Sequence, residues 1–92
     1  MDTDAWLESH PKLRAILPEA LRQIERIFGA GKPVRLNVIE DWEGTKILGI
    51  EVDFEGSGEE ASSLCRRFIY GWLVHQPRRI RKAIDCGVRF LE

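Results

Sequence analysis

The stretch that decides the fold reads VRLNVIEDWEGTKILGIEVDF and spans residues 34–54. In residues 34–39, and again in residues 48–55, apolar side chains alternate with polar or small ones. This period of two is typical of a strand that buries one face. Residues 40–45 between them are mostly acidic or turn-forming. The sequence therefore predicts two strands joined as an antiparallel hairpin.

The segment before the hairpin has helical spacing instead. Pro18 suits the first position of a helix, because the N–H that proline lacks would have no partner there. This helix is predicted to run to Phe28 and to end at the Gly-Ala-Gly run of residues 29–31. Residues 1–17 are expected to form short helical turns that extend a core of residues 18–92, within a single domain. The apolar face of the helix comprises Leu17, Ala20, Leu21, Ile24, Ile27 and Phe28.

The segment after the hairpin begins a second helix. Ser57 and Glu60 have the spacing of a capping box, in which each side chain bonds the other residue's backbone N–H. Pro77 is predicted to end the helix near His75, because the residue before a proline disfavours the helical conformation. The side chains predicted to face inward are Ala61, Leu64, Cys65, Phe68, Ile69, Trp72 and Leu73.

The last segment, residues 83–91, fits either a helix or a strand. Glycine at position 87 disfavours a helix by about 1 kcal/mol. A hairpin alone also makes a marginal sheet, which a third strand would complete. We therefore predict a strand, with Ile84, Cys86, Val88 and Phe90 facing inward.

The order of these elements predicts an α+β fold, a two-layer sandwich. Two main helices are expected on one face of a three-stranded, mainly antiparallel sheet. We expect the last strand to lie beside the first and antiparallel to it. A parallel position beside the second strand is the alternative.

Three short motifs carry a resemblance to a known group of proteins. Arg67-Phe68, Trp72-Leu73 and Pro77-Arg78, followed by an extended tail, resemble small uncharacterised bacterial proteins of helix-strand-strand-helix-strand layout. The resemblance covers roughly residues 18–92. It implies the third strand and a bacterial cytoplasmic origin, and it carries no activity.

Composition limits the class of protein. Hydrophobic residues make up 43% of the 92 residues and charged residues 32%, which is typical of a globular domain. The longest stretch without a charged or strongly polar side chain, residues 68–74, is too short to cross a bilayer, so no membrane partner is expected. An acidic N-terminus indicates no secretory signal, and two cysteines form no disulfide framework. A reducing cytoplasm is the expected compartment.

Catalytic constellations are not evident in the sequence. Cys65 and Cys86 are both predicted to face the core, where cysteine behaves as a small hydrophobe. His10 and His75 lack a partner at the spacing of a helical zinc site. We therefore expect no enzyme activity, no catalytic residue, no metal and no cofactor.

Charge is distributed unevenly along the chain. The first 60 residues carry 13 acidic and 7 basic side chains, whereas residues 61–92 carry 2 acidic and 7 basic ones. Glu51, Asp53 and Glu55 share one face of a strand and suggest a metal-dependent hydrolase as one alternative, because carboxylates ligate hard cations. A solvated face paired with Arg35 or Arg89 is the simpler interpretation.

A basic cluster suggests a second alternative, a nucleic-acid-binding regulator. Its candidate phosphate contacts are Arg78, Arg79, Arg81 and Lys82. The domain is slightly acidic overall, with a net charge of -1, and no aromatic-basic recognition motif accompanies the cluster. We therefore expect the cluster to cap the carbonyl end of the second helix and to balance the acidic strand.

The leading hypothesis is a non-enzymatic protein-interaction module. Trp42 lies among acidic residues at the hairpin tip, where it either anchors a partner or folds back onto the sheet. An open sheet face and a short strand edge are surfaces that bind another protein or a second copy as a homodimer. The candidate interaction residues are Trp42, Ile39, Ile47, Glu51 and Asp53.

Overall fold

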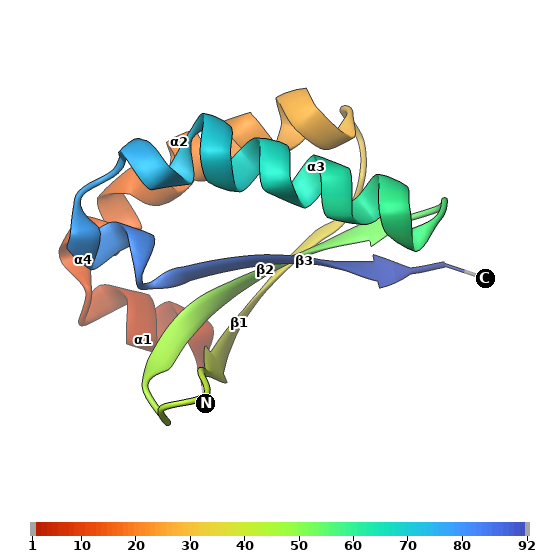
Figure 1. The fold of residues 1–92 in the computed structure, drawn as a ribbon. Coiled ribbons are helices and arrows are strands. Elements are labelled where there is room, and N and C mark those ends of the chain that lie inside the picture. The colour runs from red at the N-terminus through yellow and green to blue at the C-terminus, as the bar shows by residue number, and fades with distance from the viewer. Residues whose placement is uncertain (1, 92) are drawn as a thin grey trace.

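The computed structural model describes residues 2–91 of the chain as helices packed on a three-stranded sheet. The two long helices lie over the same face of the sheet (Figure 1). This confirms the predicted α+β fold, its helix-strand-strand-helix-strand order and its final strand. The elements are α1 (Thr3–Glu8), α2 (Pro11–Phe28), β1 (Val34–Glu40), β2 (Lys46–Phe54), α3 (Gly58–Gly71), the 3-10 helix η1 (Leu73–His75), α4 (Arg78–Arg81) and β3 (Ile84–Phe90).

Helix α2 begins earlier than predicted. It starts at Pro11 and continues through Pro18, which the sequence had placed at the helix start. Both prolines suit a first position, but the apolar stripe extends upstream, because Leu13 and Leu17 are buried along with Ala20. Burying each leucine is worth about 1.5–3 kcal/mol, which offsets the hydrogen bond that a mid-helix proline removes.

Helix α3 ends earlier than predicted, at Gly71 instead of near His75. Its start is as expected: the Ser57 hydroxyl accepts the Glu60 N–H at 3.1 Å, and the Glu60 carboxylate accepts the Ser57 N–H at 3.4 Å. At the other end, Trp72 leaves the helical conformation, with φ of −138°, and its ring lies 5.4 Å from that of Phe68. The chain therefore turns where Trp72 enters the core, before Pro77 is reached.

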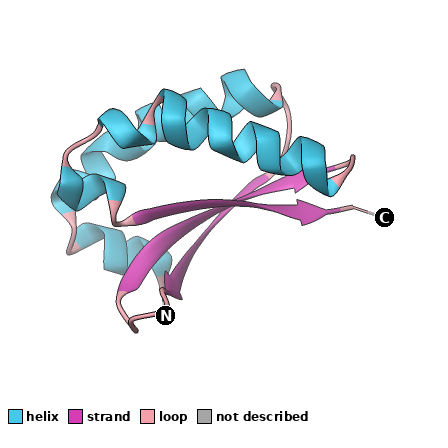
Figure 2. Ribbon diagram, viewed as in Figure 1, coloured by secondary structure: helices cyan, strands magenta, loops and turns pink. Residues whose placement is uncertain are grey.

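The strand order differs from the favoured prediction. The order is β1-β2-β3, with β1 antiparallel and β3 parallel to β2, so the sheet is mixed and the alternative placement is correct (Figure 2). Strand β2 occupies the central position and is the most deeply buried strand, with Leu48, Ile50 and Val52 at most 1% exposed. The crossover through α3 returns the chain to the end of the sheet where β2 began, which makes β3 parallel to β2.

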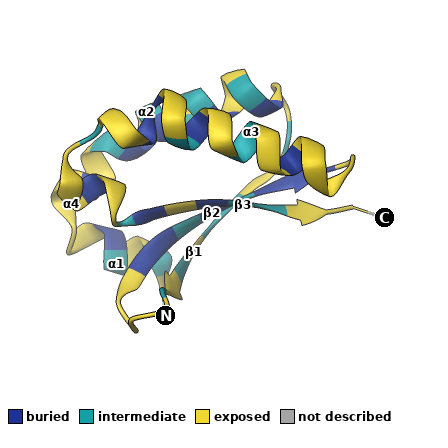
Figure 3. Cartoon of the chain, in the orientation of Figure 1, coloured by how far each residue is buried: buried dark blue, intermediate teal, exposed yellow. Residues whose placement is uncertain are grey.

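The core lies between the helices and the sheet, as the burial pattern in Figure 3 shows. Its most deeply buried side chains come from both layers: Ile24 from α2, Phe68 from α3, and Leu48, Ile50 and Val52 from β2. Trp72 is buried, as the sequence predicted, and Trp6 packs against the same cluster. The opposite face of the sheet is left for other contacts.

Candidate interaction surface

The open face of the sheet is the side turned away from α2 and α3 (Figure 1). Because side chains alternate along a strand, the residues between the core positions of β2 point to this face. They are Ile47, Gly49, Glu51 and Asp53, flanked by Arg35 and Ile39 on β1 and by Asp85 and Arg89 on β3. The open face therefore contains four of the five residues predicted to bind a partner.

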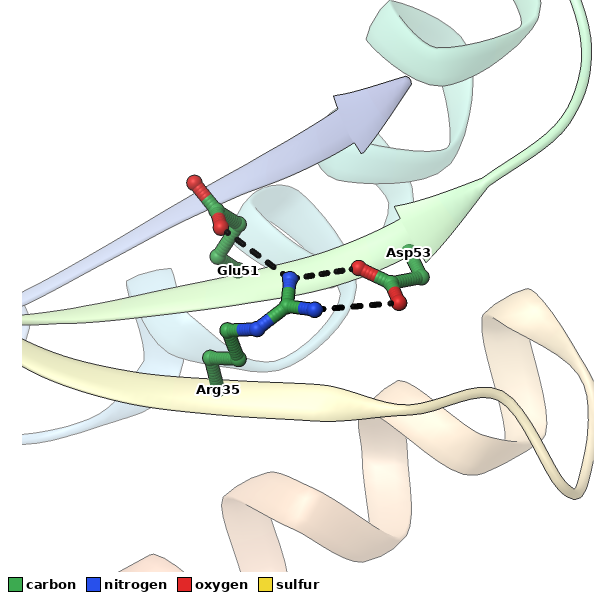
Figure 4. Close-up of polar contacts among 3 residues, drawn as sticks. All are labelled: Arg35, Glu51 and Asp53. Atoms are coloured by element: carbon green, nitrogen blue, oxygen red, sulfur yellow. Dashed lines mark hydrogen bonds and ion pairs between the residues drawn. The ribbon is translucent and has the colours of Figure 1, made fainter. Parts of the chain in front are cut away.

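An ion-pair network occupies one end of this face (Figure 4). The Arg35 guanidinium donates to the Asp53 carboxylate through Nη1 at 2.7 Å and through Nη2 at 3.4 Å. Its Nη1 also lies 3.6 Å from Oε1 of Glu51, the residue directly opposite Arg35 in the sheet. The predicted pairing with Arg35 is confirmed, while Arg89 makes no ion pair with any residue that the structure describes.

This network argues against the hydrolase alternative. Asp53 is only 8% exposed, and its oxygens face the guanidinium of Arg35. Glu55 lies beyond the end of β2 and is exposed. Among residues 2–91, no three His, Cys, Asp or Glu side chains are grouped to hold a metal ion. The three carboxylates therefore do not form a common ligand set.

A shallow apolar hollow lies beside the network. Ile39 is 36% exposed and its register partner Ile47 only 8%, so Ile39 is the more accessible of the two predicted isoleucines. Ile39 leans over Gly49, where an added Cβ would come within 3.2 Å of its Cδ1 atom. The two glycines at 49 and 87 leave a hollow of about 100 Å³ that is also lined by Glu51 and Asp85.

Trp42 projects into solvent from the hairpin tip. Its side chain is 92% exposed, which excludes one of the two alternatives: it does not fold back onto Ile39 or Ile47. The turn is held without it, because the Asp41 carboxylate accepts the N–H groups of Glu43 and Thr45, both at 2.9 Å. The indole therefore makes no evident contribution to the stability of the hairpin.

The predicted phosphate contacts form a second exposed region on and after α4. Arg78, Arg79, Arg81 and Lys82 are all exposed, and none forms an ion pair with another residue in the range 2–91. The expectation that they balance the acidic strand is therefore wrong, because Arg35 makes those contacts. Arg79 instead lines a hollow of about 240 Å³ at the start of α2, together with Lys12 and Leu13.

The two cysteines meet in the core, which the sequence did not indicate. The Sγ atoms of Cys65 on α3 and Cys86 on β3 are 3.8 Å apart, and both remain free thiols. Burial raises the pKa of both thiols above the ordinary value, and for Cys86 the neighbouring Cys65 raises the pKa further. Both cysteines were predicted to face the same core, and this was the sequence feature from which their contact could have been inferred.

The two histidines belong to other parts of the fold than the cysteine pair, since His10 precedes α2 and His75 ends η1. The His10 ring stacks on Trp6 with ring centroids 4.1 Å apart, and its Nδ1 lies 2.7 Å from the Trp6 carbonyl oxygen. His75 is exposed at the end of η1. His10 therefore contributes to the packing of α1 against the start of α2.

Comparison with known proteins adds no assignment. The chain matches no family model, and no curated protein and no solved structure is significantly similar to it. None of the helices within residues 2–91 has the length and apolar character needed to span a bilayer. The candidate surfaces therefore depend on the physical features of the chain itself.

Proposed function

We propose that this protein is a non-enzymatic interaction module that binds another protein through the hairpin tip and the adjoining open sheet face. The observation that carries the proposal is the 92% exposure of Trp42. Transfer of an exposed indole from water into an apolar pocket lowers the free energy. Tryptophan is also enriched among the residues that contribute most to binding energy. The turn itself has its own hydrogen bonds, so it does not need the indole.

The surroundings of Trp42 favour a partner of a particular chemistry. Glu40 and Glu43 are exposed on either side of it, and Ile39 adds apolar surface at the end of β1. A partner with an apolar pocket and a basic rim complements this arrangement. Asp53 and Ile47 are buried and stabilise the sheet instead, so the binding surface comprises Trp42, Ile39 and Glu51. We place this role in the bacterial cytoplasm, where two close thiols remain reduced.

A capture experiment tests the role of Trp42. Tagged wild-type chain and a Trp42→Ala variant are incubated with lysate, and bound proteins are quantified by mass spectrometry. We expect at least one protein to be retained by the wild type and lost about tenfold or more from the variant, as for a binding hot spot.

The matched control for this experiment is Tyr70→Ala. Tyr70 is also an exposed aromatic residue, at 67%, but it lies on α3, on the helical side of the molecule (Figure 1). This variant should retain the same protein as the wild type. A set of bound proteins that is identical for all three chains would contradict the proposal.

A second candidate function, binding of nucleic-acid phosphates, is favoured by the basic cluster. Its four cations are exposed and unpaired among the described residues, and Arg79 shares a hollow with Lys12. Arg79→Glu should weaken binding of a labelled duplex about tenfold at low salt, with affinity falling steeply as salt is raised. Fluorescence anisotropy measures this. Arg26→Glu on α2 makes the same change in net charge and should have little effect, whereas equal losses in both variants would contradict a specific site.

A further inference from the structure

The two edges of the sheet are not equivalent. At the β1 edge, the Thr3 hydroxyl donates to the Leu36 carbonyl at 3.4 Å, and α1 packs against the strand. At the other edge, β3 has no neighbouring strand within residues 2–91. In Figure 1, β3 is drawn along the front of the molecule with no element crossing before it. An uncovered edge strand is a template for pairing with another strand.

The backbone of β3 presents alternate residues to that free edge. The Ala83 carbonyl accepts from the Leu48 N–H at 2.7 Å, and the Leu91 N–H donates to the Phe54 carbonyl at 2.9 Å. In a parallel ladder, this pattern means that the odd-numbered residues of β3 direct their backbone N–H and C=O groups toward β2. The even-numbered residues, Ile84 to Phe90, therefore point their N–H and C=O groups outward, and these groups bond to no other residue that the structure describes.

Strand β3 carries opposite charges on the two sides of a glycine. Asp85 and Arg89 lie two residues before and two residues after Gly87, on the open face. Both are exposed, and neither forms an ion pair with another residue in the range 2–91. Just beyond them, Phe90 is 49% and Leu91 is 42% exposed, which leaves apolar surface at the same edge.

Gly87 itself is not required by the single chain. Its φ does not lie in the left-handed region, and an added Cβ would meet no atom within 4 Å. Glycine inside a strand also weakens that strand and often marks a close approach of another backbone. The position is therefore suited to contact with a second chain.

We propose that two copies of this protein pair antiparallel through β3, about a two-fold axis at Gly87, to form a continuous six-stranded sheet. The proposal rests on the interaction role above and names a second copy as one partner. In this register Asp85 of each copy lies opposite Arg89 of the other, and Ile84 lies opposite Phe90. The Gly87 pair on the axis is a non-hydrogen-bonded pair, in which the two Cα atoms approach to about 4.5 Å.

The neighbouring registers lack this complementarity. An axis at Asp85 or at Arg89 places like charges directly opposite each other, which is destabilising. An axis at Cys86 or at Val88 leaves both charges opposite uncharged residues. Shifting the register by a single residue would instead exchange the two faces of the sheet. Gly87 is therefore the centre that satisfies both the charges and the apolar pairs.

Charge exchange tests the proposal directly. The oligomeric state of the full chain is measured by sedimentation over a range of concentrations. We expect the wild type to form a dimer, and Asp85→Arg or Arg89→Asp alone to raise the dissociation constant about tenfold or more. An equimolar mixture of these two variants should form a heterodimer, because each then offers the charges that the other lacks. The doubly exchanged variant should dimerise again.

The controls separate folding from pairing. Circular dichroism should show that both single variants are folded, and Arg26→Glu on α2 should dimerise like the wild type. A wild-type chain that is monomeric at about 1 mM, or single variants that fail to form a heterodimer, would overturn the proposal. A wild-type chain that dimerises but shows no Trp42-dependent binding would contradict the proposed function alone. A wild-type chain that binds a protein through Trp42 but stays monomeric would contradict this inference alone.

Discussion

At the scale of single residues, Asp53 shows how an acidic side chain tolerates burial in this sheet. A buried charge is costly unless it is paired and hydrogen-bonded. Arg35 provides both conditions, because its guanidinium faces the Asp53 carboxylate with two donors. The sequence placed Asp53 correctly on the outer face of its strand. It also offered Arg35 as a partner, but it predicted a solvated face and missed the burial of the carboxylate, which depends on strand register.

The cysteine pair leads to a prediction about reactivity. Alkylation requires the thiolate, and the raised pKa values of Cys65 and Cys86 suppress it. At pH 8, we expect iodoacetamide to react with the native thiols about tenfold or more slowly than with the chain unfolded in urea. The native rate should still be rising above pH 9.0, the ordinary thiol value. Rates are measured by mass spectrometry.

The same pKa shifts affect stability at high pH. A thiol whose pKa is higher in the folded state than in the unfolded state stabilises the fold while it stays protonated. This contribution is complete at neutral pH and is lost as the pH rises above the ordinary value of 9.0. Replacing the deeper thiol, Cys86→Ala, should reduce the pH dependence. Equal alkylation rates in the native and unfolded chains would contradict the assignment.

At the scale of elements, α2 shows where sequence patterns lose resolution. Apolar spacing correctly predicted a helix that ends at Phe28, and the positive φ of Gly29, 105°, marks that end. The start was wrong because a proline at a helix start and a proline within a helix have the same local appearance. Only the burial of Leu13 and Leu17 against the rest of the core separates the two cases.

Pro18 therefore provides a test of the continuous helix. Pro18→Ala supplies an N–H for the Arg14 carbonyl and should raise the free energy of unfolding by about 1–3 kcal/mol, measured by urea denaturation. Pro11→Ala is the matched control, because the N–H at a first helical position has no partner within the helix. An unchanged or lower stability for Pro18→Ala would indicate a helix boundary at that residue.

The strand order illustrates a different limit. A period of two identifies which side chains of β3 face the core, and the prediction is correct for Ile84, Cys86 and Val88, whereas Phe90 is 49% exposed. It does not identify the neighbouring strand, because β3 would bury the same face beside β1 or β2. The choice depends on the path of the crossover through α3, which is a property of the assembled fold.

At the scale of the whole molecule, the core and the candidate interaction surface lie on opposite sides of the sheet. The helical side of the sheet contains the core, while the open face and the hairpin tip contain the exposed Trp42 and Ile39. The sequence identified these candidates because apolar side chains stood at positions that a single layer of helices cannot cover. It did not identify the β3 edge, which depends on the strand order.

The placement of α1 also limits how far such molecules can assemble. Its Thr3 hydroxyl already bonds the outward-facing Leu36 carbonyl and α1 packs against β1, so this edge of the sheet is partly covered. Under the proposed pairing, growth is directed to the β3 side, where joining a second copy uses the remaining free edge of the sheet. The proposed pairing would therefore give a closed pair whose sheet does not propagate into a filament.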